Sequence, residues 1–328
     1  MPDATPQSDP PEMTYRHLGD SGLVVSTVGL GGNTFGARID GATTRSVVAA
    51  ALEAGVTLVD CAELYGRQPG ESETLLGQAV KGRRDQVVLA TKFGHPAGRA
   101  DAPAWEAHGS RSAVRRSIEG SLRRLGTDHV DLYQMHTPDP STPVEETLTA
   151  LDDLVREGKV RYLGSSNFSG WQVVDADRAA EALGTERFVS AQNAYNLLDR
   201  GAEAELIPAC EHVGVGVLPY YPMASGLLSG KYRRGEPAPA GTRLSDPRMA
   251  ARLQGADFDT VEALEAFARA RGLDLVSVAL GGLAAQPAVA SVIAGATSPE
   301  QVLANVRAGL WEPSLEDLAE LEDISGRD

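Results

Sequence analysis

The chain alternates between short apolar runs and longer segments with helical spacing of apolar positions. The runs are rich in Val, Leu and Ile and do not alternate polar with apolar residues, which is typical of parallel strands buried on both faces. The predicted strands lie at residues 26–30, 57–60, 87–92, 130–136, 160–167, 188–196, 215–221 and 288–295. Several intervening helical patterns end at a glycine just before the next run, where a helix C-cap belongs.

Counting these runs gives eight strand–helix units over about 300 residues, which predicts a (β/α)₈ TIM barrel. A doubly wound sheet is the rival fold, and it carries a glycine-rich nucleotide fingerprint after its first strand. The segment "GLGGNTFG" from Gly29 resembles that fingerprint, but Thr34 stands at the third glycine position. The helix that follows begins only near Thr43, so the barrel is the preferred prediction.

Other segments define the expected domain organisation. Two short runs flank Asp20, Ser21 and Gly22, which predicts an N-terminal β-hairpin. Residues 1–13 are rich in Pro and Asp and are expected to form a disordered tail. A long loop, roughly residues 222–259, follows the seventh strand. Residues 14–328 are therefore expected to form a single barrel domain.

Composition narrows the function classes. The 328-residue chain has a net charge of -15 and no basic run, which argues against nucleic acid and anionic membranes as partners. It has two cysteines, Cys61 and Cys210, without metal-ligand spacing, so neither a disulfide framework nor a metal site is expected. No apolar stretch approaches the length of a membrane span. A cytoplasmic protein is expected, and the sequence sets no oligomeric state.

Ionisable residues follow three consecutive predicted strands. Asp60 ends the second strand and Tyr65 lies just beyond it, Lys92 ends the third, and His136 ends the fourth. Taken singly, each has an ordinary structural interpretation as a turn, packing, solvated or core residue. In a barrel, however, these strand ends share the face that carries the catalytic site. We therefore expect the four side chains to meet.

Their chemistry is complementary. A free tyrosine has a pKa near 10, and a nearby ammonium lowers it. Lys92 supplies that ammonium, Asp60 fixes it in place, and the imidazole of His136 orients a carbonyl oxygen. The set is suited to protonating an oxygen that has accepted a hydride. Because no side chain supplies a hydride, a nicotinamide cofactor is implied.

The order of the motifs resembles that of the aldo-keto reductase family. The segments that carry the resemblance are "GLGGNTFG", "VDCAELYG", "SETLLG", "LATKFG", "VDLYQMHTPDPSTPVEETL", "LVREGKVRYLGSSNFS", "QNAYNLL", "YYPMASGLLSGKY" and "VIAGATSPEQVLANV". Within the family, the pattern resembles the branch of potassium-channel β-subunit-like and bacterial members. The resemblance implies reduction of an aldehyde or ketone to an alcohol with NADPH, with Tyr65 as general acid, Lys92 and Asp60 tuning its pKa, and His136 orienting the carbonyl.

The resemblance also assigns cofactor contacts. It implies that Ser166, Asn167 and Gln192 bind the carboxamide of the nicotinamide and that the nicotinamide ring stacks on Tyr220. The pyrophosphate is covered by 221–227 and Lys231, and the adenosine end meets Gly295, Thr297, Gln301 and Asn305. The full set of expected contacts is Gly31, Gly32, Asn33, Asp60, Ser166, Asn167, Gln192, Tyr220, Tyr221, Pro222, Met223, Ser225, Gly226, Leu227, Lys231, Gly295, Thr297, Gln301 and Asn305.

The residues at the adenosine end depart from the family pattern, and the substrate is left open by it. Small reductases of the family carry Lys and Arg for the 2′-phosphate where this chain has Gly295 and Gln301. NADPH is still expected over NADH, because the channel-subunit-like branch holds it through other groups. For the small-molecule carbonyl substrate, the expected pocket residues are Phe35, Tyr65, Phe93, Trp105 and His136. A sugar-like ketone, an aromatic aldehyde and a xenobiotic all fit this set.

Two other function classes stay open at this point. The first is a cofactor-sensing regulatory or binding subunit of the same fold, with slow turnover. The second is an isomerase or sugar-phosphate enzyme on a similar barrel, for which the sequence holds no motif beyond the fold. Turnover that depends on Tyr65 would favour the reductase over both.

Overall fold

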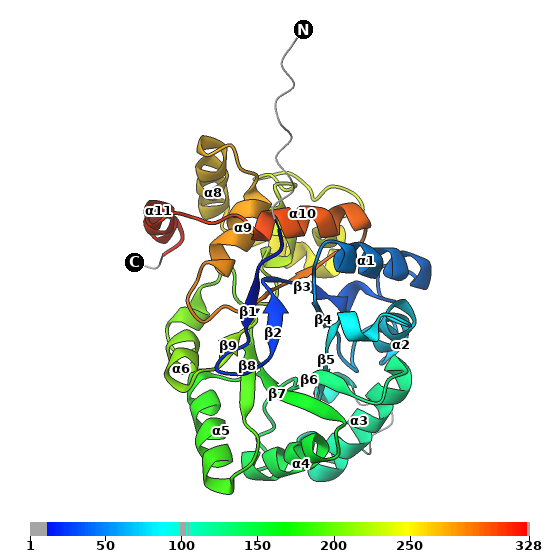
Figure 1. Ribbon diagram of the computed structural model, residues 1–328. Coiled ribbons are helices and arrows are strands. Elements are labelled where there is room, and N and C mark those ends of the chain that lie inside the picture. Colours follow the sequence, from blue (N-terminus) through cyan, green and yellow to red (C-terminus); the bar gives the residue numbers. More distant parts are fainter. Residues whose placement is uncertain (1–11, 99–102, 104, 327–328) are drawn as a thin grey trace.

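The protein is a parallel β-barrel surrounded by helices, as seen in a computed structural model that describes residues 12–98, 103 and 105–326. Eight strands form one sheet in the order β10-β3-β4-β5-β6-β7-β8-β9. Figure 1 looks along the barrel, with the helices arranged around its outside. The predicted (β/α)₈ fold is confirmed.

The strands match the predicted apolar runs. Their bounds are β3 Val28–Gly31, β4 Leu58–Asp60, β5 Val88–Phe93, β6 Val130–Met135, β7 Val160–Ser166, β8 Phe188–Gln192, β9 Gly216–Val217 and β10 Val292–Gly295. The barrel closes through the residues that precede and begin β10. Val217 N–H donates to Ala288 O over 2.7 Å, and Ile293 N–H donates to Pro219 O over 2.9 Å.

The helices of the described residues lie outside the barrel. Their bounds are α1 Gly41–Glu53, α2 Glu71–Ala79, α3 Arg111–Leu125, α4 Val144–Arg156, α5 Gly170–Leu183, α6 Leu206–Val213, α7 Ala250–Gln254, α8 Phe258–Ala270, α9 Leu275–Ala284, α10 Pro299–Gly309 and α11 Leu315–Ser325. The predicted C-cap glycines are present. Gly126 ends α3 with φ 66° and Gly214 ends α6 with φ 67°, a conformation that glycine adopts without steric cost.

The predicted hairpin covers the amino-terminal end of the barrel. It consists of β1 Tyr15–His17 and β2 Val24–Ser26, which pair antiparallel and lie in front of the barrel in Figure 1. Leu18, Leu23 and Val25 of this hairpin pack against the inward-facing residues Leu58 and Leu132. The hairpin therefore seals this end with apolar side chains, which leaves the opposite end for the site.

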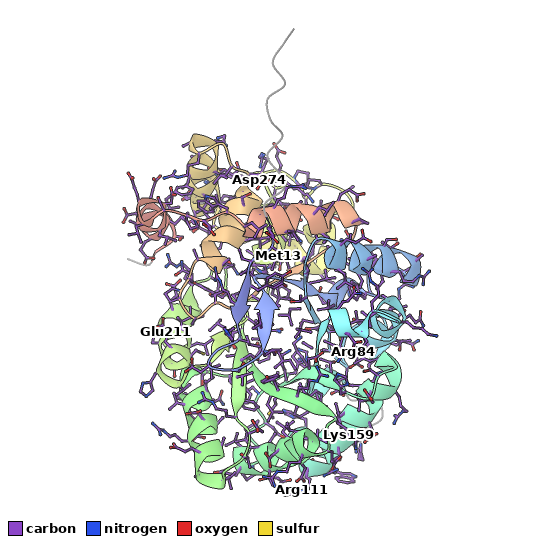
Figure 2. All side chains as sticks on the ribbon, viewed as in Figure 1. Met13, Arg84, Arg111, Lys159, Glu211 and Asp274 are labelled. Atoms are coloured by element: carbon purple, nitrogen blue, oxygen red, sulfur yellow. The ribbon has the colours of Figure 1, made fainter. Side chains whose placement is uncertain are left out.

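Most of the predicted tail, residues 1–11, lies outside the described residues. The predicted boundary at residue 13 differs from the structure at one position. Met13, labelled in Figure 2, is buried in the main core, and its sulfur accepts a hydrogen bond from Thr27 Oγ1 at 3.9 Å. Met13 therefore belongs to the folded domain.

The barrel interior changes from apolar to polar along its axis. Side chains two residues apart on a strand point the same way. Leu58, Ala90 and Leu132 accordingly form part of the apolar layer at the hairpin end. The residues two positions further on are Asp60, Lys92 and Gln134, and these are hydrogen-bonded to one another. A barrel interior is normally filled by branched apolar residues, so this buried polar layer marks the functional end.

The long loop after β9 returns across the carboxyl end of the barrel. We call residues 221–243 the strap. It includes a short 3₁₀ segment, Ala224–Ser229, with several left-handed backbone angles. On the other side of the barrel mouth, Arg38 Nη2 donates to Gly241 O at 3.5 Å and so connects the strap to the loop after β3.

Candidate functional site

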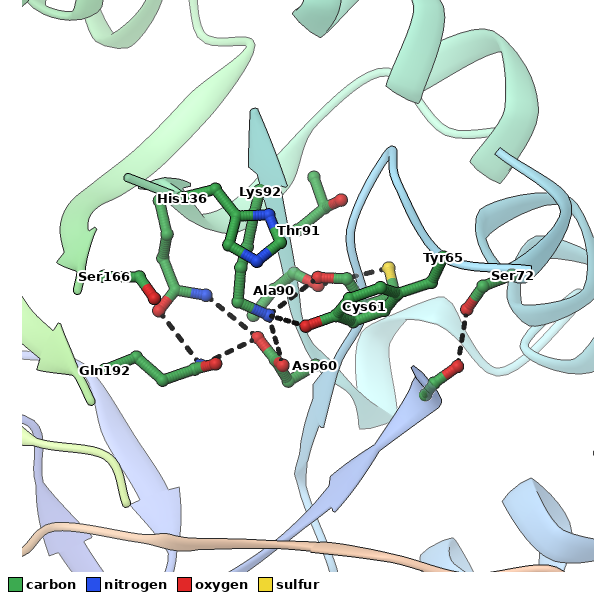
Figure 3. Close-up of polar contacts among 12 residues, drawn as sticks. Asp60, Cys61, Tyr65, Ser72, Ala90, Thr91, Lys92, His136, Ser166 and Gln192 are labelled. Carbon is green, nitrogen blue, oxygen red and sulfur yellow. Dashed lines mark hydrogen bonds and ion pairs between the residues drawn. The ribbon is translucent and has the colours of Figure 1, made fainter. Parts of the chain in front are cut away.

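Lys92 occupies the centre of the polar layer. Its side chain is fully buried, and its Nζ lies 2.5 Å from Asp60 Oδ2, 3.1 Å from Cys61 O and 3.4 Å from the Tyr65 hydroxyl (Figure 3). Burial disfavours the ammonium, but the charge of Asp60 and the contact with Tyr65 outweigh it, so the pKa of Lys92 is raised. Lys92 is therefore a fixed cation beneath the tyrosine.

The second oxygen of Asp60 is held by two amides. Gln134 Nε2 donates to Asp60 Oδ1 over 2.9 Å, and Gln192 Nε2 donates to the same atom over 3.0 Å. Gln192 also donates to Gln134 Oε1 over 3.2 Å. Gln134 was not among the expected site residues. Its position two residues before His136 on the same strand was the signal that would have revealed it.

Tyr65 is half-buried at the cavity wall, and desolvation is the main influence on the pKa of its hydroxyl. Burial raises the pKa of Tyr65 to about 12, although the charge of Lys92 and its hydrogen bond act in the opposite direction. The sequence argument predicted only the lowering effect of Lys92. In the folded protein, desolvation is the larger effect. Tyr65 is therefore protonated at neutral pH.

His136 lies beside Tyr65 at the same end of the cavity. The two ring centroids are 5.8 Å apart and the rings meet edge to face. In the described part of the chain, the buried Nδ1 of His136 has no hydrogen-bond partner. Burial, followed by the charge of Lys92, lowers the pKa of His136 to about 2. The imidazole is therefore neutral, and it is not the satisfied core histidine of the simpler interpretation.

These residues form one end of an elongated cavity of about 920 Å³. It extends from Tyr65 and His136 along the strap to the first turn of α10. The expected residues that line it are Gly31, Gly32, Asn33, Asp60, Tyr65, His136, Ser166, Asn167, Gln192, Tyr220, Tyr221, Pro222, Met223, Ser225, Gly226, Lys231, Gly295, Thr297, Gln301 and Asn305. Lys92 lies below the floor, where Tyr65 and Asp60 cover it.

Asn167 connects two other residues that line the cavity. This residue has a positive φ of 61°, which is uncommon for a residue with a side chain. Its Nδ2 donates to His136 O over 2.8 Å, and its Oδ1 accepts from the Tyr220 hydroxyl over 2.7 Å. The amide thus fixes the ring of Tyr220 against the cavity and ties it to the loop that carries His136.

Backbone strain is concentrated in the strap. Tyr221, Ala224 and Ser225 have φ angles of 55°, 47° and 61°. Together with Asn167, these are the positive-φ residues other than glycine in the described chain, and strain of this kind gathers at functional sites. The hydroxyl of Ser225 is buried and has no hydrogen-bond partner among the described residues. It lines the cavity and is available to a ligand.

At the far end, the loop before α10 is ordered by Gln301. Its Oε1 accepts hydrogen bonds from Thr297 N over 2.9 Å and Thr297 Oγ1 over 3.0 Å. Asn305 Nδ2 donates to Gly295 O over 3.2 Å. The cavity thus ends at the N-terminus of a helix of eleven residues, where backbone N–H groups favour an anion.

Several lining residues were absent from the expected set. They include Arg38, Thr137 and Arg243. The guanidinium of Arg243 lies 5.0 Å from the centroid of the Tyr221 ring. Arg38 and Arg243 come from segments far apart in sequence, and only the return of the strap brings them together.

Apart from Lys92, four expected site residues do not line the cavity. Phe93 follows the inward-facing Lys92, so strand alternation turns it outward, where it stacks on Tyr133 with centroids 4.7 Å apart. Phe35 and Leu227 are buried in the core beneath the helices. Trp105 is 84% exposed and does not border the cavity. The structure therefore corrects the expected substrate pocket for Phe35, Phe93 and Trp105, and the cofactor set for Leu227.

A (β/α)₈ barrel with its cavity at the carboxyl ends of the strands has the arrangement of a barrel enzyme. Residues 27–325 match the model of the aldo/keto reductase family. The chain belongs to this family. In the described residues, helices both long and apolar enough for a membrane span are absent.

Curated relatives cover almost the whole chain. The uncharacterized oxidoreductase YrpG of Bacillus subtilis (strain 168) is 37% identical over 318 residues, covering 95% of this chain and 96% of the relative. A probable voltage-gated potassium channel subunit beta of Oryza sativa subsp. japonica is 36% identical, covering 90% and 91%. The aldo-keto reductase YhdN of Bacillus subtilis is 34% identical, covering 95% and 93%. Family membership supports oxidoreduction of carbonyl compounds as the general activity.

Proposed function

We propose that the protein reduces an aldehyde or ketone to an alcohol with NADPH, and that Tyr65 is the general acid. The observation that carries this proposal is the buried series Asp60–Lys92–Tyr65, which ends with a hydroxyl at the cavity wall. A protonated phenol beside a fixed ammonium is suited to donating a proton to an alkoxide-like oxygen, because Lys92 stabilises the phenolate that results.

The other residues position the reacting carbonyl. His136 is neutral, so one ring nitrogen donates a hydrogen bond to the carbonyl oxygen without adding a second positive charge. Asp60 holds Lys92, while Gln134 and Gln192 fix Asp60. The chain itself thus supplies the proton and the orientation. A bound nicotinamide supplies the hydride.

The residues present fit a dinucleotide. The cavity is elongated, and Tyr220 presents an aromatic ring near the catalytic end. Along its middle, the strap offers the unpaired hydroxyl of Ser225 and the cation of Lys231. At the far end stand Gln301, Thr297 and a helix N-terminus. We assign these three regions to the nicotinamide, the pyrophosphate and the adenosine, respectively.

The charges of the cavity favour NADPH over NADH. Arg38, Lys231 and Arg243 all line it, and within the described residues none of these three makes an ion pair. Arginines left unpaired beside a cavity are suited to phosphate. They provide the positive charge that the sequence lacks at residues 295 and 301. The extra phosphate of NADPH therefore gains attraction that NADH does not.

The proposal is tested by cofactor consumption with a panel of aliphatic and aromatic aldehydes and ketones, with NADPH and NADH in parallel. Faster turnover with NADPH is expected. Tight NADPH binding without turnover of any carbonyl would instead favour a cofactor-sensing binding subunit, and two relatives are named as probable potassium channel subunits. Failure to bind either cofactor would overturn both hypotheses.

A further inference from the structure

His95 lies next to His136, at the end of the cavity where the carbonyl is proposed to bind. It lines the cavity, and its ring centroid lies 5.0 Å from that of His136, with the ring planes inclined at 62°. His95 belongs to the loop after β5 rather than to a strand, so the position of its ring depends on the contacts that fix this loop.

The loop is fixed at Gly94 from two sides. Gly94 N–H donates to the buried carboxylate of Glu63 over 3.0 Å, and Gly94 O accepts from Thr137 Oγ1 over 3.0 Å. Gly94 has φ 78°, and a side chain there would approach His108 O to within 3.2 Å. Glu63 belongs to the loop that carries Tyr65, and Thr137 follows His136. The backbone before His95 is therefore tied directly to both catalytic loops.

The hydrogen bonds of His95 define which nitrogen carries its proton. Ala97 N–H donates to Nδ1 over 3.1 Å, so Nδ1 is the acceptor and the neutral ring carries its proton on Nε2. Burial, followed by His108, lowers the pKa of His95, which keeps the ring neutral. Among the described residues, Nε2 has no hydrogen-bond partner. It is a free, oriented donor.

A polar residue, Thr137, also belongs to this part of the cavity wall. Thr137 lines the cavity next to His136, whereas Phe93 is turned into the core and Trp105 is exposed outside. Two imidazoles whose centroids are 5.0 Å apart, each reaching about 2.9 Å by hydrogen bond, can contact oxygens on adjacent carbons. His136 takes the reacting oxygen, which leaves His95 for a neighbouring one.

We propose that His95 is a specificity-determining residue that donates from Nε2 to an oxygen on the carbon next to the reacting carbonyl. The substrate class is then the small α-hydroxy or α-oxo carbonyl compounds. This inference rests on the proposed reductase function and adds its substrate class. A site built to hydrogen-bond a substrate oxygen discriminates strongly against the analogue that lacks it, because its donor is left unpaired.

The test uses two ketones of equal size, hydroxyacetone and butanone. Hydroxyacetone has a hydroxyl group where butanone has a methyl group. The measured quantity is the ratio of kcat/KM for the two ketones, compared between the wild-type protein and its variants so that their intrinsic reactivities cancel. In His95→Phe the ratio should fall about 10-fold, the effect of one lost hydrogen bond. His95→Gln, which keeps an N–H near the same position, should restore most of it.

The matched control is His129→Phe, which alters a histidine just before β6, at the opposite end of the barrel. Its ratio should equal that of the wild-type protein. Equal losses for both ketones in His95→Phe, with the ratio unchanged, would show that His95 merely supports His136 and would overturn the inference alone. If the wild-type protein turns over no carbonyl with either cofactor, the proposed function itself fails and the inference fails with it.

Discussion

The ammonium of Lys92 lies 2.5 Å from the carboxylate of Asp60; both side chains are buried, and Asp60 forms part of the cavity floor above Lys92. Removing one member of a buried pair leaves an uncompensated charge, which typically costs about 3–5 kcal/mol. Lys92→Met should therefore destabilise the protein by roughly that amount and abolish turnover. The free energy of unfolding from urea titration at pH 7 measures the first effect.

A second substitution separates charge from packing in the same pair. Adding Asp60→Asn to Lys92→Met removes the stranded carboxylate, so most of the lost stability should return while activity stays absent. A double variant as unstable as Lys92→Met would mean that packing of the lysine stem, rather than the pair of charges, dominates.

Acid should destabilise the protein through His136. The pKa of His136 is about 2 in the folded protein, against an ordinary value of 6.5. Between these two pH values the unfolded state binds a proton at His136 and the folded state does not. The stabilising contribution is complete above pH 6.5 and is lost as the pH falls toward the folded-state value, at about 1.4 kcal/mol per pH unit.

The comparison that isolates this effect is His136→Asn, unfolded by urea at pH 7 and at pH 5. The variant should lose less stability than the wild-type protein between the two values. Equal losses would place the titration of His136 close to its ordinary value and would remove the argument for a neutral, desolvated ring.

Cofactor preference should respond to charge at residue 301. Gln301→Arg places a cation at the far end of the cavity, beside Thr297. If this end binds the adenosine, the affinity for NADPH should rise relative to NADH, as measured by fluorescence titration with both cofactors. Leu303→Arg, on the same helix but not lining the cavity, is the control with the same change of charge. A matching shift in the control would reduce the effect to long-range charge.

The strap should lose its shape when Gly226 is replaced. Gly226 has φ 104°, which a residue with a side chain rarely adopts, and an added Cβ would lie 3.4 Å from the Tyr232 ring. Gly226→Ala should weaken NADPH binding severalfold, because Ser225 and its neighbours would shift from the cavity. Gly230→Ala, at φ 70° with open space around it, should have a smaller effect. Equal affinity in both variants would show that the shape of the strap does not govern binding.

Sequence patterns predicted the barrel and its central polar residues because both depend on local rules. Apolar runs buried on both faces indicate parallel strands, and parallel strands end at one face of a barrel. The positions of Asp60, Lys92 and His136 at successive strand ends were therefore sufficient to predict that they meet. Strand alternation was equally available and would have excluded Phe93, which follows the inward-facing Lys92.

Other features of the site could not be predicted from local sequence patterns, because they depend on segments that are far apart in the sequence and meet only in the folded chain. Arg38 and Arg243 are some 200 residues apart and share a cavity only because the strap crosses the barrel mouth. The acidity of Tyr65 was equally out of reach. Its pKa of about 12 reflects a balance between burial and the charge of Lys92, and the extent of burial follows from the complete fold.

The central claim is that Tyr65 donates the proton. Single-turnover reduction of hydroxyacetone by the wild-type protein and Tyr65→Phe, each saturated with NADPH, tests it most directly, with the NADPH dissociation constant measured in parallel. The variant keeps the ring but lacks the acid, so the rate should fall by about 10²–10⁴-fold while the dissociation constant changes little. A rate within a few-fold of the wild-type value, with the cofactor bound, would contradict the assignment of Tyr65 as the general acid.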